Sequence, residues 1–119
     1  MPTIRRQVRT KSNETDLQNQ ILHYLTLKQI LAWKNNRVLY YNPILKRMSK
    51  AKGVTEPGQP DILGVIPKEG RMLAIETKGK YEAIREKQET LLARLDKAGA
   101  VVIVARKLED VTQYFGGAK

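Results

Sequence analysis

The sequence predicts an α/β protein whose core is a small mixed β-sheet, and three parts of the chain lead to this prediction. Two apolar, β-branched runs flank a turn sequence at 67–70, which predicts a β-hairpin with Ile66 opposite Arg71. A helical pattern over 82–98 comes next, and an uninterrupted apolar run over 100–105 follows it. A strand–helix–strand unit pairs its strands in parallel, so the sheet should be mixed and flanked by helices on both sides.

The beginning of the chain predicts a basic arm followed by an amphipathic helix. Residues 1–12 carry several basic side chains and little apolar content, so this arm either contacts phosphate or is simply solvated. Ser12 and Asn13 are N-cap candidates, and the helix should continue to about residue 29 or 30. Its apolar stripe, at helical spacing, consists of Leu17, Ile21, Tyr24, Leu25 and the aliphatic part of Lys28.

Shorter patterns fill the remaining parts of the chain. After the first helix we expect a strand at 31–34, a turn at Asn35-Asn36, a second strand at 38–41, and a basic loop at 44–55 that could include a helical turn around 44–48. After the last strand, a closing helix over 108–115 should point Leu108, Val111, Tyr114 and Phe115 inward. The sequence thus predicts one domain over 13–116, with a short tail at 117–119.

Composition excludes several classes of site. The 119 residues include no Cys and one His, His23, so a disulfide framework, a thiolate nucleophile, a Cys-ligated zinc and a multi-His metal site are all unfavourable. No apolar run reaches the ~20 residues that a membrane span needs. We therefore expect a soluble, cytoplasmic protein.

The formal net charge of +10 favours a polyanionic partner, and nucleic acid is the first candidate. The simpler alternative is a basic protein with no specific ligand. Polar and basic residues that could contact phosphate lie before the hairpin and after its second strand; they are Lys34, Asn35, Asn36, Lys46, Arg47, Lys50, Lys52, Lys80 and Arg85.

The predicted hairpin brings two carboxylates and one ammonium together. Counting back from Ile66 and Arg71 places Asp61 opposite Glu76, and side-chain alternation puts Lys78 on the same face as Glu76. Mg²⁺ takes one or two carboxylates together with water and phosphate oxygens, and a nearby lysine can activate water or offset charge on phosphate. The simpler interpretation is a Pro-Asp turn next to an exposed cross-strand ion pair.

Three further polar residues lie on apolar helix faces that should meet this hairpin. Glu14 continues the stripe of the first helix at its open end, where it either satisfies the helix dipole or adds a carboxylate to the site. Gln18, one turn further, is the next candidate on that face. Gln88 falls on the apolar face of the 82–98 helix, so its amide either bonds to backbone or reaches the strand with Glu76.

These residues resemble a known nuclease family. Pro60-Asp61 followed by Glu76-Thr77-Lys78 matches the PD-(D/E)xK signature. The Gly-x-Pro-Asp-Ile-Leu-Gly run from position 58, the Glu-x-Lys-Gly run, the later Gln and the Gly-Ala-Val-Val-Ile-Val run are similar to the VRR-NUC (virus-type replication-repair nuclease) branch. The resemblance covers roughly 14–115 and implies a restriction-endonuclease-like core.

The resemblance also implies a set of roles. Asp61 and Glu76 would bind Mg²⁺, for which Mn²⁺ should substitute, the Thr77 carbonyl would be a further ligand, and Lys78 would position or deprotonate water. Glu14 would be a further metal-site acid. Together with Gln88 it would complete the catalytic set.

Stand-alone members of the family have a similar length and act as homodimers on branched DNA such as four-way junctions. We therefore expect a Mg²⁺-dependent, structure-selective endonuclease. The alternatives are a monomeric or complex-bound flap or nicking nuclease and a basic DNA-binding protein without activity.

Overall fold

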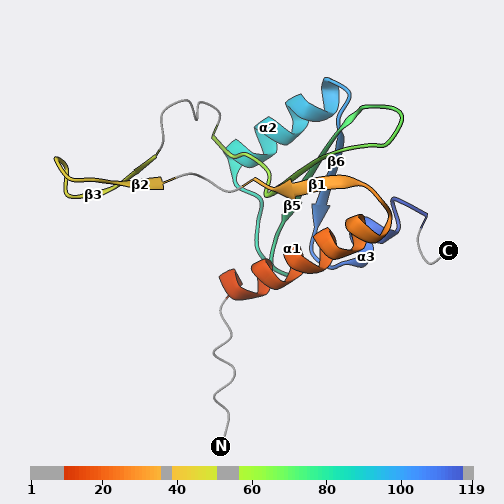
Figure 1. Ribbon diagram of the computed structural model, residues 1–119, viewed down its shortest axis with the longest axis horizontal. Coiled ribbons are helices and arrows are strands. Elements are labelled where there is room, and N and C mark those ends of the chain that lie inside the picture. Colours follow the sequence, from red (N-terminus) through yellow and green to blue (C-terminus); the bar gives the residue numbers. More distant parts are fainter. Residues whose placement is uncertain (1–9, 36–38, 51–56, 117–119) are drawn as a thin grey trace, which may run out of the picture.

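The computed structural model describes residues 10–35, 39–50 and 57–116 (Figure 1). The elements in these ranges are α1 (Thr10–Leu27), β1 (Leu31–Lys34), β2 (Leu39–Asn42), β3 (Arg47–Lys50), β4 (Ile62–Val65), β5 (Met72–Thr77), α2 (Glu86–Lys97), β6 (Val101–Ala105) and α3 (Glu109–Thr112). The predicted arm at 1–9 and the tail at 117–119 lie outside the described residues.

The main sheet has the strand order β1-β4-β5-β6, with β1, β4 and β5 antiparallel and β6 parallel to β5. In the β4–β5 hairpin Ile62 pairs with Ile75, so Asp61 lies opposite Glu76. The Ile66 N–H donates to the Arg71 carbonyl at 2.8 Å, which closes the hairpin in the predicted register. The sequence-based prediction of a mixed α/β sheet is confirmed.

Helices cover both faces of this sheet, as Figure 1 shows: α1 and α3 lie on one side and α2 on the other. The hydrophobic core fills the α1 side, where Ile21 and Leu25 of α1 pack against Ile62 and Ile75 of the hairpin. Because side chains alternate along β5, Ile75 and Thr77 face α1 while Glu76 faces α2. The strand is therefore buried on both faces over its last residues.

The β2 and β3 strands form a separate two-stranded sheet, which Figure 1 shows projecting from the rest of the molecule. The sequence-based expectation of a basic loop with a helical turn around 44–48 was wrong, because β3 pairs with β2 through Asn42 and Arg47. Lys46 takes a positive φ of 56° in the connecting turn, which is incompatible with a right-handed helix. Positions 36–38 and 51–56 lie outside the described residues, so Asn36 and Lys52 are not placed.

The predicted helix ends needed correction. The first helix begins at Thr10 rather than at a cap on 12–13, and it ends at Leu27 because Gln29 takes a left-handed φ of 61°. The second helix begins at Glu86, four residues later than predicted. The closing helix is only Glu109–Thr112, and Tyr114, predicted to face inward, is 52% exposed. Among the described residues no helix has the length and apolar character needed to cross a membrane.

Gly58 fixes how the chain approaches β4. Its φ is +76°, and a Cβ built on it would lie 2.6 Å from the Lys87 carbonyl oxygen of α2. Only glycine combines this backbone conformation with so close an approach. The segment carrying Pro60 and Asp61 is thereby pressed against the start of α2, next to the end of β5.

Candidate active site

The predicted site residues meet at the carboxyl end of β5, where the first turns of α1 and α2 approach from opposite faces of the sheet. Asp61 comes from the residue before β4, and Glu76 and Lys78 come from the last residues of β5 and just after it. Glu14 comes from α1 and Gln88 from α2. The fold therefore gathers five side chains from four separate stretches of sequence.

Asp61 is held by the neighbouring strand. Its Oδ2 accepts a hydrogen bond from the Thr77 N–H at 3.0 Å and from the Thr77 Oγ1 hydroxyl at 2.6 Å. Thr77 Oγ1 in turn accepts from Gln18 Nε2 at 3.0 Å, so α1, β5 and the Asp61 carboxylate are joined in one chain of bonds. Both hydrogen bonds that Asp61 accepts from the described part of the chain use Oδ2, which leaves Oδ1 available to a ligand.

The backbone around Asp61 is fixed from the β1 side. The Asn35 N–H donates to the Asp61 carbonyl at 2.7 Å, and Asn35 Nδ2 donates to Gln59 Oε1 at 2.8 Å and to the Pro60 carbonyl at 3.2 Å. The sequence suggested a phosphate contact for Asn35. In the structure its amide positions the segment that carries the aspartate, and the phosphate contact stays a prediction.

Glu76 is a buried carboxylate, and only one of its two oxygens has a partner among the described residues. Its side chain is 3% exposed, its Oε2 accepts from Gln88 Nε2 at 2.8 Å, and Lys78 Nζ lies 3.6 Å away. Its Oε1 is buried with no hydrogen-bond partner among the described residues. Burial raises the pKa of Glu76 to about 7, the nearby Asp61 carboxylate adds to the rise, and Lys78 acts in the opposite direction. A carboxylate in this environment is stabilised by binding a cation or a proton.

Gln88 satisfies both alternatives that the sequence left open. Its Nε2 donates to Glu76, while its Oε1 accepts from the Arg85 N–H at 3.0 Å, one of the free donors at the start of α2. The same amide thus caps a helix and holds the acid. Because Gln88 is the third residue of α2, the position of Glu76 depends on where that helix begins.

Lys78 is held between two carboxylates. It is 3% exposed, and its Nζ lies 3.6 Å from Glu76 Oε2 and 3.6 Å from Glu82 Oε2. Glu82 was not among the sequence-based candidates, because it was expected inside the helix. Its position four residues after Lys78 was the one feature of the sequence that could have suggested this ion pair. In the structure Glu82 lies in a loop, and its Oε1 accepts a hydrogen bond from the Gly79 N–H at 3.0 Å.

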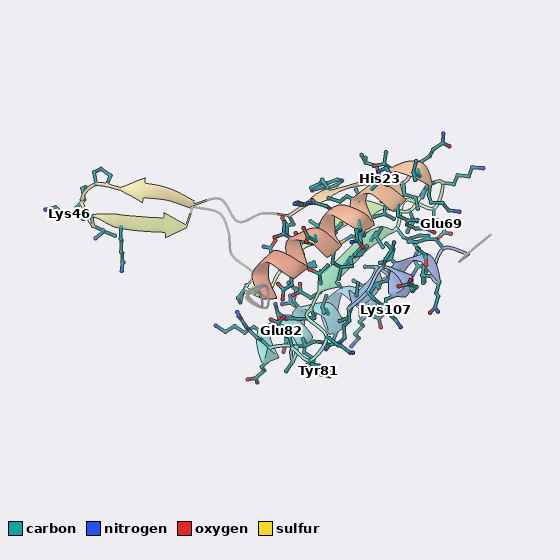
Figure 2. The ribbon with its side chains drawn as sticks, turned by 90° about the horizontal axis from the view of Figure 1, so that it is seen from below. His23, Lys46, Glu69, Tyr81, Glu82 and Lys107 are labelled. Carbon is teal, nitrogen blue, oxygen red and sulfur yellow. The ribbon has the colours of Figure 1, made fainter. Side chains whose placement is uncertain are left out.

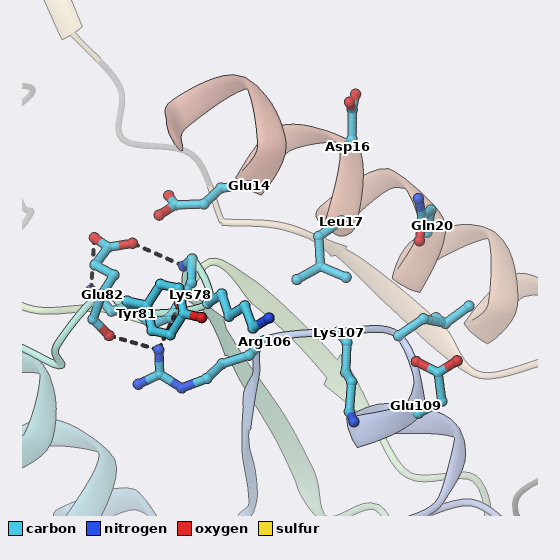
Figure 3. Close-up of a pocket in the computed structure, with 13 residues that line it drawn as sticks. Glu14, Asp16, Leu17, Gln20, Lys78, Tyr81, Glu82, Arg106, Lys107 and Glu109 are labelled. Atoms are coloured by element: carbon cyan, nitrogen blue, oxygen red, sulfur yellow. Dashed lines mark hydrogen bonds and ion pairs between the residues drawn. The ribbon is translucent and has the colours of Figure 1, made fainter. Parts of the chain in front are cut away.

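Glu14 extends from α1 toward Glu82, as Figure 3 shows, and the Asp61 carboxylate also acts on it. Burial and the neighbouring Glu82 raise the pKa of Glu14 to about 7, while the hydrogen bonds from Glu14 and the Gly79 N–H lower the pKa of Glu82 to about 2. The two carboxyl groups therefore titrate as a pair rather than independently. In the ranges that the structure describes, no three Asp, Glu or His side chains are grouped closely enough to hold a metal ion.

The residues expected to contact DNA are spread over the surface. Lys34 is half-buried in β1, while Lys46 and Arg47 are exposed on the hairpin. Lys80 and Arg85 are exposed on the loop after β5 and at the start of α2. Lys50 belongs to β3, whose pairing with β2 places it on the same hairpin.

The family model described as "VRR-NUC domain" matches residues 3–107, so the chain belongs to the VRR-NUC family. That membership makes the protein a nuclease of the PD-(D/E)xK type. A solved structure described as "VRR_NUC domain protein" is similar, with a TM-score of 0.53, 17% identity, and coverage of 86% of this chain and 84% of that one. No curated protein matches the sequence.

Proposed function

We propose that this protein is a Mg²⁺-dependent endonuclease that hydrolyses phosphodiester bonds in branched DNA. The supporting observation is the buried Glu76 carboxylate, whose Oε1 lacks a partner among the described residues and lies next to Asp61. A buried, incompletely paired carboxylate beside a second carboxylate is costly unless a cation neutralises them. Oxygen ligands of this kind suit Mg²⁺, and Mn²⁺ accepts the same ones.

The residues present fit such an ion. Asp61 and Glu76 would hold it, with the Thr77 carbonyl and water as further oxygen ligands. Glu14 is directed toward Glu82 in this structure, so it would reach the ion only through a bridging water or after a change of rotamer. When bound, the metal supplies a more acidic water and neutralises charge on the phosphate. Lys78, held by two carboxylates, places its ammonium where it can orient that water or offset charge on the phosphate. Gln88 keeps Glu76 Oε2 occupied, so Oε1 is the oxygen left for the ion.

The charge of the whole chain supports DNA as the substrate. A protein of net charge +10 attracts phosphate, whereas the grouped carboxylates repel it unless a cation lies between them. Basic DNA binding without catalysis would not require those carboxylates.

An exposed apolar row on one face of the sheet supports a homodimer. Leu31, Val65 and Met72 form one cross-strand row over β1, β4 and β5, and they are 67%, 36% and 38% exposed. This row lies on the face opposite Ala32, which packs against the core. Apolar rows of this kind are typical of surfaces that another chain covers. A dimer about a two-fold axis would place two sites for symmetric cutting of a four-way junction.

Cleavage of a labelled four-way junction in Mg²⁺ tests the activity. Lys78→Ala should bind the junction with unchanged affinity and cut it at least about a hundredfold more slowly, because the charge opposite the reacting phosphate is lost. Linear duplex of the same sequence is the control substrate. Junction and duplex cut at equal rates would remove the structure selectivity, and Lys78→Ala cutting at the wild-type rate would remove the proposed site.

The oligomeric state has its own test. The wild type should sediment as a dimer, and Leu31→Glu should sediment as a monomer, because a charge would be buried in the interface. A wild-type monomer would instead favour the flap or nicking nuclease that acts alone or within a complex.

A further inference from the structure

We propose that Tyr81 forms a stacking site for an unpaired base of the DNA strand, next to the phosphate that is cut. The proposal rests on the proposed function and deepens it, because it names the form of DNA that the site accepts. Three observations support it: the ring is exposed, hydrogen bonds hold its loop in place, and cationic side chains lie beside it.

Tyr81 is exposed yet adjacent to the catalytic lysine. Its side chain is 88% exposed, three residues beyond Lys78. Both residues line a pocket of about 1000 Å³ that also includes Glu14 and Arg106, and Figure 3 shows Tyr81 beside Lys78 and Arg106. The ring therefore borders the same space in which a phosphate would meet Lys78.

The loop that carries Tyr81 is held in place by several hydrogen bonds. Arg106 Nη1 donates to the carbonyls of Gly79 at 2.6 Å and Glu82 at 2.7 Å. The Glu82 carboxylate accepts from the Gly79 N–H at 3.0 Å, and the Glu82 N–H donates to the Gly79 carbonyl at 3.2 Å. The two residues that flank Lys80 and Tyr81 are thus tied to each other and to the end of β6. An aromatic ring on so constrained a loop is preorganised for a ligand.

The surroundings of the ring suit a nucleotide. Lys80 Nζ lies 5.4 Å from the centre of the Tyr81 ring, and Arg106 uses one nitrogen for its two carbonyl bonds. Its other guanidinium nitrogens make no hydrogen bond to the described residues, so their donors can bind a phosphate. An exposed ring flanked by cations is the arrangement that proteins use to stack bases of single-stranded nucleic acid. Because bases in a continuous duplex are already stacked on one another, the ligand must be unpaired, as at the open centre of a branch.

Binding measured without cleavage tests this proposal. The probe is a short single-stranded oligonucleotide that carries 2-aminopurine, in Ca²⁺ in place of Mg²⁺, with a duplex of the same sequence as the second ligand. Tyr81→Ala should bind the single strand about tenfold more weakly, the loss expected for one base–aromatic stack, and should bind duplex as the wild type does. Stacking should quench the 2-aminopurine fluorescence in the wild type and in Tyr81→Phe and Tyr81→Trp, but not in Tyr81→Ala.

Tyr114→Ala is the matched control, because Tyr114 is also exposed but does not line the pocket. It should bind both ligands as the wild type does. Unchanged single-strand binding by Tyr81→Ala would overturn the proposal, as would an equal loss for duplex. If the differential binding is found but the wild type cuts no DNA in Mg²⁺, the stacking site stands and the endonuclease proposal fails.

Discussion

The carboxyl end of β5 and the β2–β3 hairpin both combine β-structure with charged side chains, but the first is buried in the main sheet and the second has an exposed turn. The strand β5 lies between β4 and β6, and Glu76, Thr77 and Lys78 are at most 3% exposed. The hairpin forms a sheet of its own, and residues 43–47 at its turn are exposed. Figure 2 shows Lys46 at its tip, well separated from Tyr81 and Glu82.

The contrast shows what each task demands of the structure. Chemistry on a phosphate requires acids and an ammonium fixed to within a fraction of an ångström, and only a packed sheet with helices on both faces provides that constraint. Attraction of DNA requires positive charge, and that attraction acts over several ångströms. A two-stranded hairpin of marginal stability is sufficient for the second task and not for the first.

The largest expected effect comes from disturbing the packing behind the site. Gly58→Ala should lower the free energy of unfolding by about 3 kcal/mol, because the new Cβ meets the Lys87 carbonyl oxygen at 2.6 Å and the φ of +76° is also unfavourable. Urea denaturation measures the change. Gly70→Ala is the matched control: its φ is +73° with no atom within 4 Å, so it should cost only about 1 kcal/mol. Equal losses in the two variants would contradict the close approach.

The next effect concerns the buried charge itself. The pKa of Glu76 is raised in the folded state from 4.5 to about 7, so the folded protein holds the proton more tightly than the unfolded chain. Without metal, its contribution to stability is complete below pH 4.5 and falls as the pH rises through 7. In EDTA, Glu76→Gln should therefore be more stable than the wild type at pH 8, by on the order of 2 kcal/mol, and equally stable at pH 4, below the unfolded pKa of 4.5.

The measurement is the free energy of unfolding at both pH values, and the glutamine introduced by Glu76→Gln keeps an oxygen for the Gln88 donor. Adding Mg²⁺ at pH 8 should stabilise the wild type and leave the variant unchanged. Parallel pH profiles for the two proteins would show that Glu76 does not carry the uncompensated charge.

The smallest effect is expected in the hairpin and should leave the fold untouched. The double variant Lys46→Ala with Arg47→Ala should weaken DNA binding about tenfold and reduce the slope of log affinity against log salt by about 2, because two phosphate contacts are lost. Its free energy of unfolding should stay within about 0.5 kcal/mol of the wild type. The control is the double variant Lys28→Ala with Lys97→Ala, which removes two positive charges outside the hairpin. If it loses as much affinity for DNA as the hairpin variant, net charge alone explains the weaker binding.

Much of the fold was accessible from the sequence because it depends on local patterns. The turn at 67–70, which places Ile66 opposite Arg71, determined the register that brings Asp61 opposite Glu76. Helical periodicity predicted that Gln88 would face the sheet, and it does. Helix ends were less accessible: the start of α2 moved from 82 to 86 because the Glu82 carboxylate binds Gly79 and Lys78 rather than extending the helix.

The sequence by itself determined which residues share a strand face and which strand pairs are antiparallel or parallel, because side-chain alternation and turn chemistry act between near neighbours. Only the tertiary structure decided that Thr77 holds Asp61, that Glu82 pairs with Glu14 and Lys78, and that Glu76 Oε1 has no partner among the described residues. These contacts join segments far apart in the chain. Their geometry depends on how α1, α2 and the sheet pack together, and this packing cannot be predicted from local sequence patterns.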